Sequence, residues 1–252
     1  MSPERPAVHA SAAVGFERAA EAYDRGRPDF PPIAIASLVA ELDLRPGRTL
    51  LELGAGTGKL TKMLTPSGAR TVAVEPVAAM RARLVEAAPS AEVMGAVAED
   101  LPLGDASIDA AVAAQAFHWF EGHRALEELA RVLVPGARLA LVWNVRDEHT
   151  SWVRAFSELI EPHRGDAPTH RSMRWMAAFD ESDAFERPER TSFPYEHRTT
   201  RDRMVDRVLS ISFIAALDEQ TRADIAKRAR ELAPGDDVVF PYRTDVWLTA
   251  RR

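Results

Sequence analysis

The sequence contains no cysteine. This absence excludes disulfide bonds, thiolate nucleophiles and most zinc sites, because all of them need that side chain. A chain without cysteine suits a reducing compartment, so we expect a cytoplasmic location. No stretch is apolar for long enough to span a bilayer, and Met1 to Ala13 lack the apolar core of a secretory signal peptide.

An excess of positive charge is also missing. The chain of 252 residues has 32 Lys and Arg against 38 Asp and Glu, which gives a formal net charge of −6. Nucleic acids and anionic membranes are bound by clustered basic side chains, so we expect neither as a partner. The hydrophobic fraction of 46% is that of an ordinary globular protein. Since α/β folds of this length commonly stay undivided, we expect 1–252 to form one domain, as a monomer or a homodimer.

Apolar residues alternate between two kinds of spacing along the first part of the chain. Helical spacing starts at Phe16, and a second helix presents Ile35, Leu38, Val39 and Leu42 on one face. Short apolar runs then predict strands near residues 49–53, 71–74, 92–97, 108–114 and 138–143, with helices between them. This alternation predicts an α/β fold, a doubly wound and mostly parallel sheet with helices on both faces.

The rhythm changes after residue 144. We predict a helix over 150–161, a polar loop or cap up to Pro188, a strand over 191–196, helices around 204–209 and 225–232, and a final strand over 238–248 that Pro241 interrupts. The expected organisation is therefore N-terminal lid helices in 1–45, a cofactor-binding core in 46–150, and sheet completion with an acceptor cap in 151–252.

A glycine-rich segment, Glu52-Leu53-Gly54-Ala55-Gly56-Thr57-Gly58, connects the first predicted strand to a helix. Glycines at this place let a ligand approach the backbone, as in nucleoside-cofactor sites. A dinucleotide loop would place its third glycine where this chain has Lys59, and a phosphate-binding P-loop would need Ser or Thr where Leu60 stands. Both phosphate interpretations are weakened, although a nicotinamide-dependent oxidoreductase stays open as an alternative.

An acidic residue, Glu75, follows the second predicted strand. Its carboxylate can accept hydrogen bonds from both hydroxyls of a ribose. This acid is common to nicotinamide and S-adenosylmethionine proteins, and together with the G-x-G-x-G spacing it favours the sulfonium cofactor. The alternative is a glycine-rich turn followed by a surface glutamate.

The chain resembles class I S-adenosylmethionine-dependent methyltransferases over nearly its full length. Within them it resembles the small-molecule branch that includes trans-aconitate-methyltransferase-like proteins, through the segments 23–28 (Tyr-Asp-Arg-Gly-Arg-Pro), 98–102 (Ala-Glu-Asp-Leu-Pro) and 115–120 (Gln-Ala-Phe-His-Trp-Phe). The resemblance implies a Rossmann-like sheet of seven strands whose last strand is antiparallel. It also implies transfer of a methyl group from S-adenosylmethionine to a small-molecule acceptor.

The resemblance further implies where the cofactor binds. Gly54, Gly56 and Gly58 would line its methionine part, Glu75 would hold the ribose, and Ala98 with Glu99 would border the adenine. Relatives commonly carry Asp before that Ala-Glu pair, whereas this chain has Val97, so either Glu99 or only the backbone meets the adenine. The complete set of expected cofactor residues is Tyr23, Arg27, Glu52, Gly54, Gly56, Thr57, Gly58, Glu75, Pro76, Met80, Ala98, Glu99 and Gln115.

Two flanking segments carry side chains that could complete the site. Tyr23 and Arg27 lie four positions apart, so a helix through both would point them to one side, where Arg27 could pair with the methionine carboxylate. The alternative packs Tyr23 on the sheet and leaves Arg27 in solvent. His118 follows the fourth strand and is the candidate catalytic residue, as a general base for a hydroxyl or acidic carbon acceptor. Its alternative is a packed wall residue, and a carboxylate acceptor would need no base.

The remaining patterns are weaker. No H-E-x-x-H motif occurs, so we expect no metal site. Trp143 and Asn144 could border the acceptor or belong to the core. A group of arginines, Arg198, Arg201, Arg203 and Arg207, could attract an anionic acceptor, but a solvated basic helix face is the expected interpretation. A non-catalytic cofactor-binding sensor would share the whole site and lack only turnover.

Overall fold

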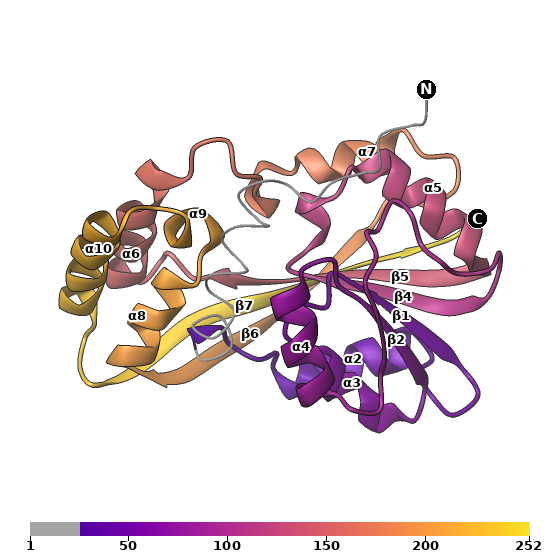
Figure 1. Cartoon of the computed structure of the whole chain (residues 1–252), viewed down its shortest axis with the longest axis horizontal. Helices are drawn as coiled ribbons and strands as arrows, with labels where there is room; N and C mark the ends of the chain where they lie inside the picture. The colour runs from indigo at the N-terminus through magenta and orange to yellow at the C-terminus, as the bar shows by residue number, and fades with distance from the viewer. Residues whose placement is uncertain (1–25) are drawn as a thin grey trace.

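The computed structural model describes residues 26–252, which build a twisted sheet with helices on both faces (Figure 1). The strand order is β3-β2-β1-β4-β5-β7-β6. The strands are β1 (Thr49–Leu53), β2 (Arg70–Val74), β3 (Glu92–Met94), β4 (Ile108–Ala114), β5 (Leu133–Arg146), β6 (Glu189–Thr200) and β7 (Asp237–Ala250). All pairs from β3 to β5 are parallel, whereas β7 is antiparallel to both β5 and β6. The prediction of a doubly wound, seven-stranded and mostly parallel sheet with an antiparallel last strand is confirmed.

The two faces of the sheet are covered by different helices. The helices are α2 (Pro32–Glu41), α3 (Thr61–Leu64), α4 (Ala78–Ala87), α5 (Gly122–Val132), α6 (Ser151–Ile160), α7 (Ala177–Asp180), α8 (Arg201–Leu209), α9 (Ser212–Ala215) and α10 (Glu219–Leu232). Successive strand side chains point to opposite faces. Leu51 of β1 therefore packs in the core beneath α5 and α7, and Leu50 in the core beneath α2 and α3. The lid helix expected around Phe16 and Tyr23 lies outside the described residues.

The β6–β7 pair projects beyond its neighbour in the sheet. Arg146, the last residue of β5, pairs with Tyr242, so residues 237–241 of β7 pair with β6 alone. Helices α6, α8, α9 and α10 pack on this projecting part in a separate hydrophobic cluster that includes Phe156, Val208 and Phe240 (Figure 1). The C-terminal cap is thereby held beside the carboxyl end of β5, at the edge where open α/β sheets bind ligands.

Several boundaries differ from the sequence-based expectation. β5 begins at Leu133 and includes Pro135 and Gly136, because a register shift against β4 accommodates the extra residues as a bulge. β3 stops at Met94. The segment up to Pro188, expected to be a loop or cap, contains α7 and three short 3-10 turns, Glu161–His163, His170–Ser172 and Arg174–Met176.

The prediction that Pro241 interrupts the last strand is wrong. Pro241 pairs with Glu196 within the continuous strand β7. Its carbonyl oxygen accepts a hydrogen bond from the Asp147 N–H at 3.0 Å, so its backbone faces the side where β5 has already ended. A proline there breaks no ladder hydrogen bond, because no strand residue needs the N–H that it lacks. None of the helices within residues 26–252 is long and apolar enough to cross a membrane.

Candidate functional site

The glycine segment forms the tight connection that follows β1. Gly54, Gly56 and Gly58 all adopt positive φ angles, of 63°, 59° and 83°, which L side chains rarely adopt. At Gly54 the space is also closed, since an added Cβ would lie 2.6 Å from the Cβ of Ala116. The loop backbone consequently passes close to the end of β4.

Glu75 holds this loop from the end of β2. One carboxylate oxygen accepts a hydrogen bond from the Gly56 N–H and the other from the Val77 N–H, both at 2.9 Å. Burial raises the pKa of this carboxyl group, and the two backbone hydrogen bonds act in the opposite direction. A carboxylate oxygen has two lone pairs, so each can still accept one hydroxyl hydrogen bond. Glu75 can therefore join the loop to a diol.

A small cavity of about 40 Å³ opens beside the loop, lined among others by Arg27, Glu52, Gly54, Gln115 and Asn144. Glu52 is 1% exposed, and its Oε2 has no hydrogen-bond partner within residues 26–252. Burial raises the pKa of Glu52 to about 8. A buried carboxyl group with an unused acceptor is suited to a cationic ligand group.

Gln115 reaches the same cavity through a strained backbone. Its φ angle is 56°, an unusual value for a residue with a Cβ, and such strain often accompanies ligand sites. The Gln115 N–H donates to the Val142 carbonyl at 2.8 Å, which fixes the turn after β4 to β5. Asn144 is anchored beside it, accepting from the Thr244 hydroxyl at 2.6 Å and donating to the Asp29 carbonyl at 3.0 Å.

His118 lies in the 3-10 turn Phe117–Trp119 that follows β4. Its Nδ1 accepts a hydrogen bond from the Trp143 Nε1–H at 3.3 Å, so the neutral ring carries its proton on Nε2. Burial, with further contributions from His170 and nearby arginines, lowers the pKa of His118 to about 3. The imidazole is neutral at physiological pH, with Nε2–H as its donor.

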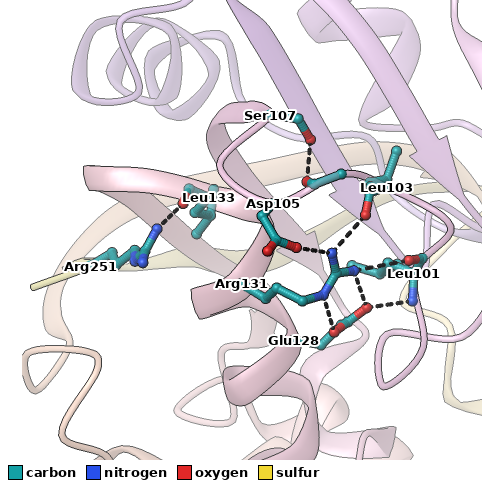
Figure 2. Close-up of polar contacts among 9 residues, drawn as sticks. Leu101, Leu103, Asp105, Ser107, Glu128, Arg131, Leu133 and Arg251 are labelled. Atoms are coloured by element: carbon teal, nitrogen blue, oxygen red, sulfur yellow. Dashed lines mark hydrogen bonds and ion pairs between the residues drawn. The ribbon is translucent and has the colours of Figure 1, made fainter.

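The segment with Ala98 and Glu99 is tied to helix α5. Glu99 Oε1 accepts the Glu121 N–H at 2.8 Å, and Ala98 is buried. Figure 2 shows how Arg131 of α5 holds the following residues, donating to the carbonyls of Leu101 and Leu103 at 3.1 and 2.7 Å. The Arg131 guanidinium also pairs with Glu128 and Asp105. The helix thus fixes the edge that is expected to border a base.

The other expected cofactor residues are distributed around Glu75 and the loop. Thr57 and Met80 are each 2% exposed. Met80 packs with Val77 directly after Glu75, and the Pro76 carbonyl accepts from Arg81 at 2.6 Å. Tyr23 lies outside the described residues, and the assignment of the whole set to a cofactor stays a prediction. Within residues 26–252, no three His, Asp or Glu side chains are grouped as metal ligands.

A second cavity of about 110 Å³ continues from the first beneath the cap. Its lining includes five arginines: Arg27, Arg146, Arg164, Arg171 and Arg207. Sequence reasoning missed Arg146, Arg164 and Arg171, and it expected Arg207 on a solvated face. Arg207 is instead 8% exposed. Its position three residues after the buried Met204 of α8 is the signal that could have placed it on the inner face.

Comparisons with known proteins agree with one another. A family model described as a methyltransferase domain matches residues 51–141. An uncharacterized methyltransferase of Mycobacterium tuberculosis is 37% identical over 238 residues, covering 92% of this chain and 93% of the relative. An uncharacterized methyltransferase-like protein of Schizosaccharomyces pombe is 31% identical over 230 residues, covering 88% and 90%. A solved Anaeromyxobacter dehalogenans protein, assigned as a type II methyltransferase, superimposes with a TM-score of 0.61 at 27% identity, covering 89% and 96%.

Proposed function

Because this chain belongs to the class I S-adenosylmethionine-dependent methyltransferases, we propose that it methylates a small-molecule acceptor with S-adenosylmethionine as donor. The observation that carries the proposal is the pair formed by Glu75 and the glycine loop. The Glu75 carboxylate, which can accept from two ribose hydroxyls, and a glycine-rich loop meet at the carboxyl ends of β1 and β2. This is the arrangement that a nucleoside needs.

The residues of the first cavity fit the amino acid part of the cofactor. Glu52 supplies a buried carboxylate oxygen that lacks a partner within the described residues, and the cofactor's ammonium group would satisfy it. Arg27 lines the same cavity and provides a guanidinium for the cofactor's carboxylate. Gln115, with its strained backbone, offers a polar side chain between these two groups and the second cavity.

The reaction requires no covalent catalysis by the protein. The cofactor supplies an activated methyl group on a sulfonium leaving group. The protein aligns the acceptor with that methyl group, excludes water and keeps the approach in line. The second cavity shares Arg27, Gln115, Asn144 and Arg207 with the first, and it therefore provides the acceptor's place next to the donor.

The proposed role of His118 is set by its neighbours. A general base must accept a proton on a free nitrogen, but Nδ1 already accepts from Trp143 and Nε2 carries the ring proton. Its depressed pKa adds that the protonated ring would be poorly stabilised in this site. These observations favour His118 as a hydrogen-bond donor in the acceptor cavity, and the role of general base stays a prediction that kinetics must test.

Ligand-dependent thermal stability tests the cofactor. We expect S-adenosylmethionine and S-adenosylhomocysteine to raise the melting temperature of the full chain, since a ligand that binds only the folded state stabilises it. NAD and ATP should have no effect, because the loop lacks the third glycine spacing and the P-loop lysine motif. Stabilisation by NAD alone would contradict the proposal. Adenosylhomocysteine release in an acceptor screen then separates an enzyme from a non-catalytic sensor.

Substitution of Glu75 tests the ribose contact. We expect Glu75→Gln to lower the affinity for S-adenosylhomocysteine by roughly tenfold, because a charge-assisted hydrogen bond to a ribose hydroxyl is lost while the shape is kept. Titration calorimetry gives the affinity, and circular dichroism checks the fold. The exposed Glu92 on β3 is the matched control, and Glu92→Gln should bind normally. Normal binding by a folded Glu75→Gln variant would remove Glu75 from the site.

A further inference from the structure

The charge of the second cavity is opposite to that of the protein. The chain has a formal net charge of −6, yet of the sixteen residues within 26–252 that line the cavity five are arginines and none is Asp or Glu. Low-dielectric walls concentrate the field of such a cluster in the cavity. A neutral ligand in the cavity would gain little from this positive field, and a cationic ligand would be repelled by it.

Two of the five arginines are neutralised from outside the cavity. Arg164 forms a two-bond pair with Glu161, with distances of 2.8 and 2.6 Å. Arg171 pairs with Glu148 at 2.5 Å. The charges of these two arginines are therefore balanced within the protein, and their side chains form part of the cavity wall.

Arg146 and Arg207 are not neutralised in this way. Arg146 donates from Nε to the Ser157 hydroxyl at 3.0 Å and lies over the Phe156 ring. Within residues 26–252 it makes no direct ion pair, although the charge of Glu148 partly offsets its own. Arg207 is 8% exposed, and its Nε and Nη1 are buried without a hydrogen-bond partner in the described part of the chain. An unpaired buried guanidinium costs free energy in the folded state. An anion in the cavity would remove that cost.

The two guanidinium groups come from different elements that meet at this place. Arg146 is the last residue of β5, and Arg207 lies on the inner face of α8. Burial together with the charge of Arg207 lowers the pKa of Arg146 to about 9, as expected for two cations that share one cavity. The chain at Gly26 packs directly on the Arg207 backbone, where an added Cβ would lie 2.3 Å from the amide nitrogen. This close approach leaves no room for a side chain at position 26 beside α8.

Neutral donors complete the lining. His118 carries its proton on Nε2, because its Nδ1 accepts from Trp143. Asn144 and Thr169 add polar groups, while Ile160, Ile211 and Phe213 supply apolar surface. The cavity is therefore suited to a ligand that carries a charged group next to an apolar carbon skeleton.

We propose that Arg146 and Arg207 form an anion-binding subsite that holds a carboxylate or phosphate group of the methyl acceptor, with His118 Nε2–H as an additional donor. The proposal rests on the proposed function, since it takes the second cavity as the acceptor's place. Two guanidinium groups match the planar oxygens of a carboxylate and the three oxygens of a phosphate group. Anionic acceptors are thereby selected over neutral analogues of the same shape.

Binding of simple probes tests the subsite directly. The full chain is titrated with succinate, with inorganic phosphate and with the uncharged succinamide, with and without saturating S-adenosylhomocysteine. We expect succinate or phosphate to raise the melting temperature and to give a measurable affinity by calorimetry, and the comparison of the two identifies the preferred oxyanion. Succinamide should do neither. Equal responses to succinate and succinamide, or no response to either anion, would overturn the proposal.

Three arginine variants locate the response. Arg207→Met and Arg146→Met should each weaken anion binding at least tenfold, whereas Arg203→Met, which removes an exposed arginine from the same helix, should leave it unchanged. Arg207→Met should also raise the melting temperature of the unliganded chain, because a buried unpaired charge is removed. Unchanged anion binding in both cavity variants would assign these arginines a structural role and overturn the proposal.

The cofactor titration separates the two proposals. If wild-type protein fails to bind S-adenosylhomocysteine, the proposed function fails, but the titration without cofactor still reports on the subsite. Arg207 also lines the first cavity. Should Arg207→Met and Arg146→Met lose affinity for S-adenosylhomocysteine and keep their anion affinity, the two arginines would belong to the cofactor's carboxylate, and the subsite would be refuted.

Discussion

Burial of the His118 ring has a measurable effect on stability, because it lowers the pKa of the imidazole. In an unfolded chain the imidazole takes up a proton near its ordinary pKa of 6.5, whereas in the folded protein the pKa is about 3. As pH falls from 6.5 towards 3, the unfolded state binds a proton that the folded state cannot. The contribution of His118 to stability is therefore fully present above that range and is lost as pH falls through it.

Replacement of His118 by Gln should remove this part of the pH dependence. We expect the free energy of unfolding of His118→Gln to fall less steeply than that of wild type between about pH 6.5 and 4, because the amide does not titrate. Urea unfolding at a series of pH values measures the difference, and comparison with wild type cancels the contribution of His170. Parallel curves would show that His118 titrates normally. The rate constant kcat/KM should likewise show no ionisation of His118 between about pH 5 and 8.

Glu52 shows the opposite behaviour. Its pKa of about 8, raised by burial from the ordinary value of 4.5, means that the folded free protein keeps a proton at neutral pH that the unfolded chain releases. Stability linked to Glu52 is present below about pH 4.5 and is lost as pH rises towards 8. Binding of the cofactor's ammonium group favours the ionised carboxylate, and binding should therefore release a proton.

Calorimetry in buffers of different ionisation enthalpy detects that proton. At pH 7 we expect the binding enthalpy of S-adenosylhomocysteine to depend on the buffer for wild type, and this dependence to disappear for Glu52→Gln. The variant should also be more stable than wild type at pH 8, since no buried carboxyl group has to stay protonated. A buffer dependence that persists in the variant would assign the proton to another group.

The glycine loop and Glu75 could be singled out from the sequence, whereas the meeting of Arg146 and Arg207 could not. Gly54, Gly56 and Glu75 follow their strands at fixed short distances, so local spacing is enough to identify them. Arg146 and Arg207 are distant in sequence, and their meeting depends on how far β7 projects past β5. No local sequence pattern predicts how far β7 extends beyond the end of β5. An arginine on an amphipathic helix is most simply interpreted as solvated, and only the packing of α8 reveals otherwise.

At the level of elements, α5 holds the segment that follows Ala98 and Glu99 through one side chain. Arg131 joins the 101–105 segment to Glu128 of its own helix through several hydrogen bonds (Figure 2). We expect Arg131→Met to lower the free energy of unfolding by roughly 2 kcal/mol, because carbonyl acceptors and the Glu128 carboxylate lose their partner. It should also weaken S-adenosylhomocysteine binding several-fold, since Ala98 and Glu99 precede this segment.

Arg124 on the same helix is the control for this prediction. It forms a single exposed pair with Glu121 at 3.4 Å, and such pairs contribute little. Arg124→Met should change the unfolding free energy by less than about 0.5 kcal/mol and leave binding intact. Chemical denaturation and calorimetry on both variants provide the comparison. Equal losses in the two variants would show that Arg131 has no special role in holding the loop.

Element boundaries were predictable where the pattern was simple. Strand β1 and strand β4 match their expected ranges because each is a short apolar run buried on both faces. The start of β5 was placed five residues late because Pro135 and Gly136 suggest a turn, whereas a bulge keeps them in the strand. The interruption expected at Pro241 failed for a related reason, since the effect of a proline depends on the neighbour that its nitrogen faces.

At the scale of the whole molecule, two kinds of core are distinguishable. The clusters beneath α5 and α2 pack on the parallel sheet, whereas the cap cluster packs α6, α8 and α10 on the projecting β6–β7 pair. Units that share few contacts open separately.

We expect amides of α8 and α10 to exchange hydrogen faster than those of β1 and β4, and ligand binding to slow the exchange of α8 selectively. Hydrogen exchange followed by mass spectrometry measures both, with β2 as reference. Uniform exchange would indicate a single cooperative unit.

The geometry of the β6–β7 pair also bears on which changes the segment between these two strands can accept. Thr200 and Asp237 are paired at the open end of the ribbon, and the Arg201 N–H donates to the Asp236 carbonyl at 2.9 Å, so the segment 201–236 leaves and re-enters the sheet at one point. Because the two ends of this segment lie next to each other, an insertion or deletion within it need not move either strand. A change of length or sequence within 201–236 can therefore leave the pairing of β6 with β7, and the glycine loop after β1, in place.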